Sequence, residues 1–138
     1  MRKIHISRHK ITIINIRKPL NKNINQQLQW FGTSLGLFNL RDKDKSCFRI
    51  FIELLKAAKN RTALSSDELA YRLGLSRGTI VYHINKLMES GIVVSEHNKY
   101  MLRVDNLGSL IDEVERDIKE ATEQLRAVAK DIDTRLGL

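Results

Sequence analysis

The fold of this chain is decided by residues 65–104, SSDELAYRLGLSRGTIVYHINKLMESGIVVSEHNKYMLRV. Ser65 and Glu68 have the spacing of a capping box, in which each side chain accepts a hydrogen bond from the other residue's backbone N–H, so a helix begins here. Gly74 provides the turn after this helix, and Ser76 caps the next one. Two short helices joined by a tight, glycine-containing turn form a helix-turn-helix.

The residues that follow the second helix predict a β-hairpin. Gly91 ends the helix, and residues 92–96 and 99–104 alternate apolar and polar side chains on either side of a short polar turn at residues 97–98. Residues 62–64 are placed to add a third strand. Because a helix-turn-helix followed at once by a hairpin is a winged helix, we predict a mainly α (α+β) chain built on a winged helix-turn-helix.

The segment LSRGTIVYHINKLMESGIV, residues 75–93, resembles the recognition-helix segment of ArsR-type winged-helix transcription regulators. The shared pattern is Ser, two variable residues, Thr and an aliphatic residue, then His-aliphatic and a Leu before a Gly-aliphatic strand start. The resemblance covers residues 44–104 and implies a winged-helix fold that binds double-stranded DNA. Many of these regulators hold a metal with paired cysteines or clustered His and acidic residues. Cys47 is the only cysteine of this chain, so we expect no metal sensing.

The second helix of the motif has an anchored face and a polar face. At 100° per residue, Ile80, Ile84 and Leu87 point within about 40° of one direction. Arg77 is at the helix start, where a recognition helix meets base edges, and is expected to contact a guanine. His83 is interpreted as a packed or buttressing histidine. The polar face and one lysine of the wing are expected to contact bases, sugars or phosphates. The predicted DNA-binding residues are Ser76, Arg77, Gly78, Thr79, Tyr82, Asn85, Lys86 and Lys99.

Residues 104–132 carry apolar side chains at alternating spacings of three and four, which is a coiled-coil heptad seam. A helix from Ser109 to Arg135 is about 40 Å long, which is more than a small winged helix covers, so part of the seam needs a partner. The simplest partner is the same helix of a second subunit, and the alternative is residues 24–38 of the same chain. We expect both contacts, in an interface between subunits that is built from the helices over residues 24–38 and 109–135. The predicted dimerisation residues are Leu28, Phe31, Leu35, Ile111, Val114, Ile118, Leu125, Val128 and Ile132.

The first part of the chain predicts a strand pair and a helix. Isoleucines alternate with polar residues over residues 3–16, which favours a β-hairpin over a basic arm that orders only on a partner. After Pro19, Asn21 or Asn23 can cap a helix over residues 24–38, whose apolar side chains lie on one stripe.

Two glycines within that stripe have a cost of about 1 kcal/mol each relative to alanine. We interpret Gly32 and Gly36 as places where another helix approaches closely, and the alternative is a helix that is short or broken at Gly32. Asp42 or Asp44 is expected to cap a further helix that carries the apolar side chains of residues 47–58. Because that helix is apolar on two sides, we predict that it is central.

Positive charge is concentrated towards the N-terminus. The chain holds 24 Lys and Arg against 16 Asp and Glu, a net charge of +8. Residues 1–41 hold eight basic residues and no acidic one, residues 42–106 have a net charge of +3, and residues 107–138 have a net charge of −3. A polyanion is therefore expected to meet the chain away from the C-terminal helix. We divide the chain into a basic extension (1–41), the winged helix (42–105) and a dimerisation helix (106–138).

Composition excludes several other classes of protein. No apolar run approaches the ~18 residues of a membrane helix, and no continuous apolar signal core is present at the start, so we expect a cytoplasmic protein that binds no membrane. A single cysteine makes no internal disulfide and no multi-cysteine metal cage. We find no nucleophile–base pair, carboxylate dyad or phosphate-binding glycine loop, so we expect no enzyme activity and no cofactor or metal.

These observations favour a sequence-specific, double-stranded DNA-binding transcriptional regulator. We expect a homodimeric repressor that reads a palindromic site with the helix over residues 76–90, because a two-fold pair of recognition helices reads two half-sites. Two alternatives remain open, a winged-helix protein–protein assembly module and an architectural protein that binds DNA without sequence preference. The sequence does not identify a small-molecule effector.

Overall fold

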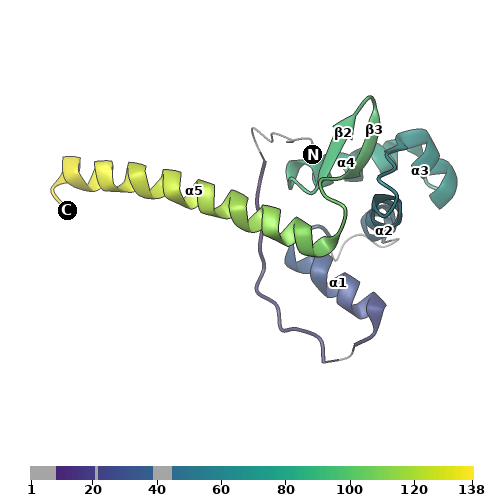
Figure 1. Ribbon diagram of the computed structural model, residues 1–138, viewed down its shortest axis with the longest axis horizontal. Helices are drawn as coiled ribbons and strands as arrows, with labels where there is room; N and C mark the ends of the chain where they lie inside the picture. Colours follow the sequence, from purple (N-terminus) through teal and green to yellow (C-terminus); the bar gives the residue numbers. More distant parts are fainter. Residues whose placement is uncertain (1–8, 21, 39–44) are drawn as a thin grey trace. The chain divides into compact units, whose positions relative to one another are not determined.

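The computed structural model describes residues 9–20, 22–38 and 45–138, which fall into two compact units. The first unit extends to Asn106, and the second begins at Leu107. Figure 1 shows the elements of both units along the chain. The first strand of the predicted N-terminal hairpin and Asn21, one of the two predicted caps of the first helix, lie outside the described residues. Asp42 and Asp44 lie outside them as well, but the prediction that one of them caps the next helix is wrong, because Lys45 is at the N-cap position of that helix and makes no side-chain cap hydrogen bond.

Helix α1 (Ile24–Ser34) begins where one of the two predicted caps is placed. The Asn23 side chain accepts hydrogen bonds from the backbone N–H groups of the second and third residues after it, at 2.9 and 3.3 Å. The prediction that the helix continues to residue 38 is wrong, because α1 ends at Ser34 and Gly36 adopts a φ of +71°. The chain turns back there, and a β-carbon on Gly32 would lie 1.8 Å from the Phe38 ring. The close neighbour of Gly32 is therefore an aromatic ring of its own chain and not another helix.

Helix α2 (Ser46–Ala58) is central, as its two apolar faces predict. Ile50, Phe51 and Leu54 are completely buried. Cys47 is buried too, and its thiol sulfur lies 3.0 Å from the carbonyl oxygen of Leu37. The cysteine is thus a core residue that joins α2 to the loop after α1.

The predicted winged helix-turn-helix is confirmed. It consists of β1 (Leu64–Ser65), α3 (Ser66–Leu73), α4 (Arg77–Glu89), β2 (Val93–Glu96) and β3 (Lys99–Leu102). The three strands form an antiparallel sheet in the order β1-β3-β2. The capping box between Ser65 and Glu68 is present, and Gly74 has the left-handed φ of +65° that the turn requires.

The wing turns at His97 and Asn98, both of which have positive φ, at 52° and 61°. Positive φ at both central residues is the signature of a type I′ turn, whose twist matches that of the two flanking strands. The turn fixes the register of the wing, in which Glu96 lies opposite Lys99.

The core of the first unit lies between the helices and the sheet. Helix α4 packs on α2, α3 and β2, and α2 also packs on β3. The three predicted anchor residues of α4 (Ile80, Ile84 and Leu87) are at most 1% exposed. Burial of each large aliphatic side chain contributes about 1.5–3 kcal/mol, so this face of α4 is firmly fixed and the opposite face is left to solvent.

Residues 9–20, called the strap below, form neither a strand nor a helix. The part of the predicted hairpin that lies within the described residues is therefore not formed as a strand. Instead, the N–H of Lys10 donates to the carbonyl oxygen of Glu89 at 2.6 Å, and the N–H of Ile14 donates to the carbonyl oxygen of Ser34 at 2.7 Å. The strap thus pairs with the C-terminal ends of α4 and α1, where helices have carbonyl groups without intrahelical partners.

The second unit is one long helix, α5 (Leu107–Leu136), of 30 residues. At 1.5 Å per residue it is about 45 Å long. Leu110 and Val114 are its buried residues, whereas every residue from position 121 onwards is exposed. The prediction of the heptad seam omitted Leu110, and Ile111, which it included, is 38% exposed. Among the described residues, no helix is both long and apolar enough to cross a membrane.

Candidate nucleic-acid interface

The start of α4 is organised by the cap at Ser76. Its hydroxyl oxygen accepts a hydrogen bond from the backbone N–H of Thr79 at 3.1 Å and lies 2.8 Å from the Thr79 hydroxyl. A cap of this kind fixes the first helical turn. The hydroxyls of Ser76 and Thr79 therefore stabilise the first turn of α4. Both residues also lie near the surface, at the end of α4 where a recognition helix meets DNA.

The predicted polar face of α4 lies in solvent. Arg77, Gly78, Asn85 and Lys86 are exposed, and the Tyr82 side chain is 56% exposed. A β-carbon on Gly78 would meet nothing within 4 Å. The protein's own packing therefore does not require a glycine here, and the backbone of α4 is open to close approach by another molecule.

Tyr82 and Lys86 form one unit on this face. The Lys86 ammonium lies 4.5 Å from the centroid of the Tyr82 ring, which is cation–π geometry. The ring of the half-buried His83 also contacts the Tyr82 ring edge to face, with a centroid distance of 5.1 Å. The position of His83 agrees with its interpretation as a buttressing residue, since its ring supports that of Tyr82.

Two of the predicted DNA contacts form ion pairs with acids of α3. The Arg77 guanidinium lies 3.7 Å from the Asp67 carboxylate, and the Lys99 ammonium lies 3.8 Å from the Glu68 carboxylate. All four side chains are at least 41% exposed. Exposed pairs contribute only about 0–1 kcal/mol and are screened by salt, so a phosphate or a base edge can replace either carboxylate.

Lys99 is the first residue of β3, directly after the turn at the tip of the wing, and its ammonium lies beside α3. The sheet pairs it with Ser65 of β1 and with Glu96 of β2, whereas the tip of the wing is formed by His97 and Asn98. The structure thus brings Lys99 close to the start of α3. His97 and Asn98, which form the tip, were not among the predicted DNA-binding residues.

The fold changes the ionisation of Glu68. The backbone N–H of Ser65 donates to its carboxylate, and this hydrogen bond is the main reason why the pKa of Glu68 lies below its usual value. The Ser65 side chain, Lys99 and Arg72 lower this pKa further. The carboxylate therefore stays charged at the start of α3, where a negative charge is also favoured by the helix dipole.

Sequence analysis missed Tyr71 of α3, whose side chain is 91% exposed. A helical wheel would have found it, because Leu69 is buried, Leu73 is half-buried, and Tyr71 lies on the opposite side of the helix. It also missed Arg49 of α2, whose guanidinium donates to the carbonyl oxygen of Leu73 at the end of α3. Arg49 thereby holds the turn between the two helices of the motif.

The predicted dimerisation residues divide into two groups by their burial in the single chain: five are buried or half-buried, and four are exposed. Leu28 and Phe31 of α1 are half-buried, and Leu35 is buried just after that helix. In α5, Val114 is buried and Ile118 is half-buried. The remaining residues are exposed, and they are Ile111, Leu125, Val128 and Ile132. Within the described part of the chain, no three His, Cys, Asp or Glu residues are grouped so that they could hold a metal.

Comparison with known proteins supports the assignment of the central domain. Residues 44–96 match the family model of a helix-turn-helix domain. The match covers less than half of the chain and runs from two residues before α2 to the end of β2. No curated protein and no solved structure was found to match the chain. The winged helix and this match together indicate a DNA-binding regulator.

Proposed function

We propose that this protein is a transcriptional regulator that binds double-stranded DNA as a homodimer and reads a palindromic site with α4. One observation supports this function above the others. The polar face of α4 is exposed over more than two turns, while its apolar face is buried against α2 and α3. A helix fixed in this way presents side chains of defined position to a DNA groove, which admits one α-helix.

Each polar residue of α4 has a contact suited to its chemistry. Arg77, in the first turn, reads a guanine through its two parallel N–H groups once it leaves Asp67. Asn85 and Tyr82 contact base edges or sugars, and Lys86 neutralises a phosphate. The exposed backbone at Gly78 lets α4 lie close to the DNA strand.

The homodimer is supported by the exposed apolar side chains of α5. Leu125, Val128 and Ile132 are between 47% and 69% exposed, at the a and d positions of one heptad seam. Burying each of them against a second copy would contribute about 1.5–3 kcal/mol. The dimer would act as a repressor by occupying a promoter, since a small chain of this kind needs no further domain to block access.

Selection of bound sequences from random duplexes tests this proposal. We expect an enriched palindrome whose two half-sites are centred about 10 base pairs apart, or a multiple of that spacing. A control variant, Arg135→Ala at the end of α5, should select the same palindrome, because residues 107–138 carry a net charge of −3. An enriched single half-site would contradict the dimer, and the absence of any enriched sequence would contradict base reading.

A different function, that of a protein–protein assembly module, is favoured by the ion pairs that the acidic residues of α3 form with Arg77 and Lys99. Asp67 and Glu68 partly neutralise Arg77 and Lys99, which reduces the positive potential of this surface. Such a module would bind duplex DNA weakly at any sequence. An architectural DNA-binding protein would instead bind tightly but with equal affinity for selected and scrambled duplexes at one salt concentration.

A further inference from the structure

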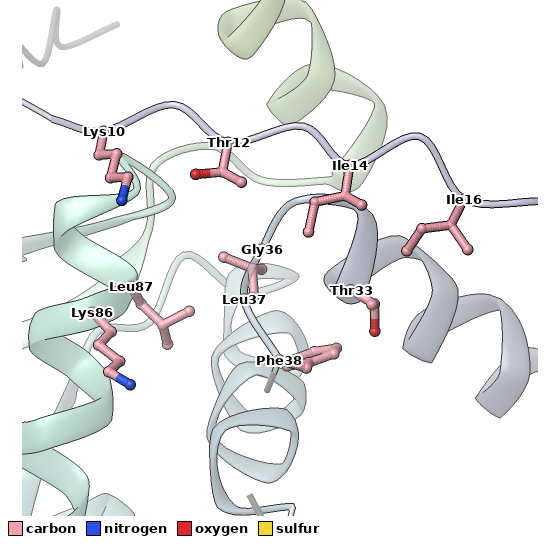
Figure 2. A pocket seen from close by; sticks show the side chains of 10 residues that line it. All are labelled: Lys10, Thr12, Ile14, Ile16, Thr33, Gly36, Leu37, Phe38, Lys86 and Leu87. Atoms are coloured by element: carbon pink, nitrogen blue, oxygen red, sulfur yellow. The ribbon is translucent and has the colours of Figure 1, made fainter. Parts of the chain in front are cut away.

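A cavity of about 540 Å³ lies in the first unit, beside the C-terminal half of α4. It is bordered by the strap, by the end of α1 with the loop that follows, and by α4 itself. Figure 2 shows that Lys10, Ile14 and Ile16 point from the strap towards the opposite wall. The cavity is lined by Lys10, Thr12, Ile14, Ile16, Thr33, Gly36, Leu37, Phe38, Lys86 and Leu87. Its volume is within the range of about 300–1,000 Å³ that is common for small-ligand sites.

The wall formed by the strap is held at several points. Besides the backbone hydrogen bonds of Lys10 and Ile14, the indole N–H of Trp30 donates to the carbonyl oxygen of Ile16 at 3.1 Å. The side chain of Thr12 lies against Gly36, where a β-carbon would be 2.8 Å from its methyl carbon. These contacts join the strap to the C-terminal end of α4 at Lys10, and to α1 and the loop that follows it at Thr12, Ile14 and Ile16.

The cavity is lined by apolar side chains and by two positively charged ones. Ile14, Ile16, Leu37, Phe38 and Leu87 supply aliphatic and aromatic surface, and two lysines supply the charge. None of the lining residues is acidic. A ligand that fits this pattern carries an apolar chain and one anionic headgroup that can accept hydrogen bonds from the two ammonium groups.

We propose that this cavity binds a small amphipathic carboxylate, such as a medium-chain fatty acid, as an effector of DNA binding. The carboxylate lies towards Lys10 and Lys86, and the hydrocarbon chain lies among the apolar side chains. Two lysines and threonine hydroxyls offer few donors, which suits a singly charged carboxylate better than a doubly charged phosphate ester.

The coupling to DNA runs through Lys86, and this part of the proposal rests on the function proposed above. Lys86 lines the cavity and also lies over the ring of Tyr82 on the polar face of α4. A carboxylate in the cavity attracts the Lys86 ammonium away from the DNA-facing side. Ligand binding therefore weakens DNA binding, and by thermodynamic linkage DNA weakens ligand binding by the same factor.

Trp30 allows the site to be tested on the protein alone. It is the single tryptophan of the chain, and its indole is hydrogen-bonded to Ile16, which lines the cavity. Titration with octanoate should change the Trp30 fluorescence to saturation. Decanoate should bind about 15-fold more tightly than octanoate, because each buried methylene contributes a factor of about four. Octanol, which lacks the charge, should bind at least about tenfold more weakly than octanoate.

Two variants locate the binding site. Lys10→Gln keeps the backbone hydrogen bond to Glu89 but removes the charge, and it should weaken octanoate binding about tenfold. Lys18→Gln is the matched control, since Lys18 is an exposed lysine of the same strap that does not line the cavity. Equal octanoate affinity in the two variants, equal affinity for octanol and octanoate, or no saturation would each overturn the proposed site.

The coupling is tested separately with duplex DNA at constant salt. Saturating octanoate should lower the affinity of the wild-type protein for its selected duplex at least about fivefold, and Lys10→Gln should need about tenfold more octanoate for the same effect. An unchanged DNA affinity in protein that is saturated with octanoate would overturn the coupling. The fluorescence titration contains no DNA, so failure of the DNA-binding proposal does not affect the test of the site.

Discussion

At the scale of single residues, Gly32 and Gly78 differ in whether the packing of the chain requires a glycine. The missing β-carbon of Gly32 makes room for the Phe38 ring, which also makes edge-to-face contacts with Phe48 and Phe51 at centroid distances of 5.2 and 6.0 Å. Gly78 has no such neighbour. The core therefore requires the first glycine, whereas the packing of the described chain does not require the second.

Substitution of these two glycines should have opposite consequences. Gly32→Ala should lower the free energy of unfolding by about 1–3 kcal/mol, because the Phe38 ring cannot move away from its aromatic neighbours without cost. Gly78→Ala should leave that free energy unchanged or raise it by up to about 1 kcal/mol, while it weakens DNA binding. Urea unfolding and a duplex-binding titration measure the two effects. Equal unfolding curves for both variants would contradict the packing role of Gly32.

Glu68 gives a prediction about pH. Its pKa is lowered in the folded state, chiefly by the hydrogen bond from the Ser65 N–H. The carboxylate therefore stabilises the fold above its usual pKa of 4.5, and this contribution is lost as the pH falls below 4.5 through the lowered value. Glu68→Gln retains a capping side chain without the charge. The wild type should lose more stability than Glu68→Gln between neutral pH and pH values below 4.5, as measured by urea unfolding, and parallel losses would contradict this.

At the scale of the elements, those with local signals could be predicted from the sequence. The capping box of α3, the glycine turn, the cap of α4 and the wing each depend on residues within a few positions of one another. The polar face of the candidate site followed from helical periodicity alone. These features account for α3, α4, the wing and the exposed residues of α4, whereas β1 (Leu64–Ser65) lies later than the strand predicted over residues 62–64 and pairs with the distant β3.

The remaining elements depend on distant partners, which a local pattern does not contain. The alternating isoleucines of the strap are typical of a strand, yet its backbone groups bond to the ends of α1 and α4. After the end of α1 the chain turns back at Gly36, and Phe38 packs on Gly32 of the same helix. The cavity could not be predicted for the same reason, since its walls come from three segments of the chain that only the fold brings together.

At the scale of the whole molecule, the exposed seam of α5 predicts self-association. Leu125→Asp places a charge in the seam and should convert a dimer to a monomer, because an unpaired charge buried at an interface is strongly unfavourable. Leu125 is 69% exposed in the single chain, so this substitution should leave the fold intact. Light scattering gives the mass of the particle, and circular dichroism checks the helix content.

Lys130→Asp is the matched control for this substitution. Lys130 lies on the same exposed stretch of α5 at the heptad position opposite the seam, and the introduced residue is identical. This variant should remain a dimer. A Leu125→Asp protein that keeps the mass of two chains would remove the seam from the interface, and so would a Lys130→Asp protein that becomes monomeric to the same extent.

The central claim is that side chains of α4 recognise the base edges of a specific DNA sequence. Its most direct test is the ratio of affinities for a selected duplex and a scrambled duplex, measured for the wild type, Arg77→Ala and Lys86→Ala at about 150 mM salt. We predict a wild-type ratio of at least about 10³. The ratio should fall about 5- to 150-fold in Arg77→Ala, whereas Lys86→Ala should weaken binding to both duplexes alike and reduce the salt dependence by about one phosphate contact. A ratio that Arg77→Ala leaves unchanged would contradict the account.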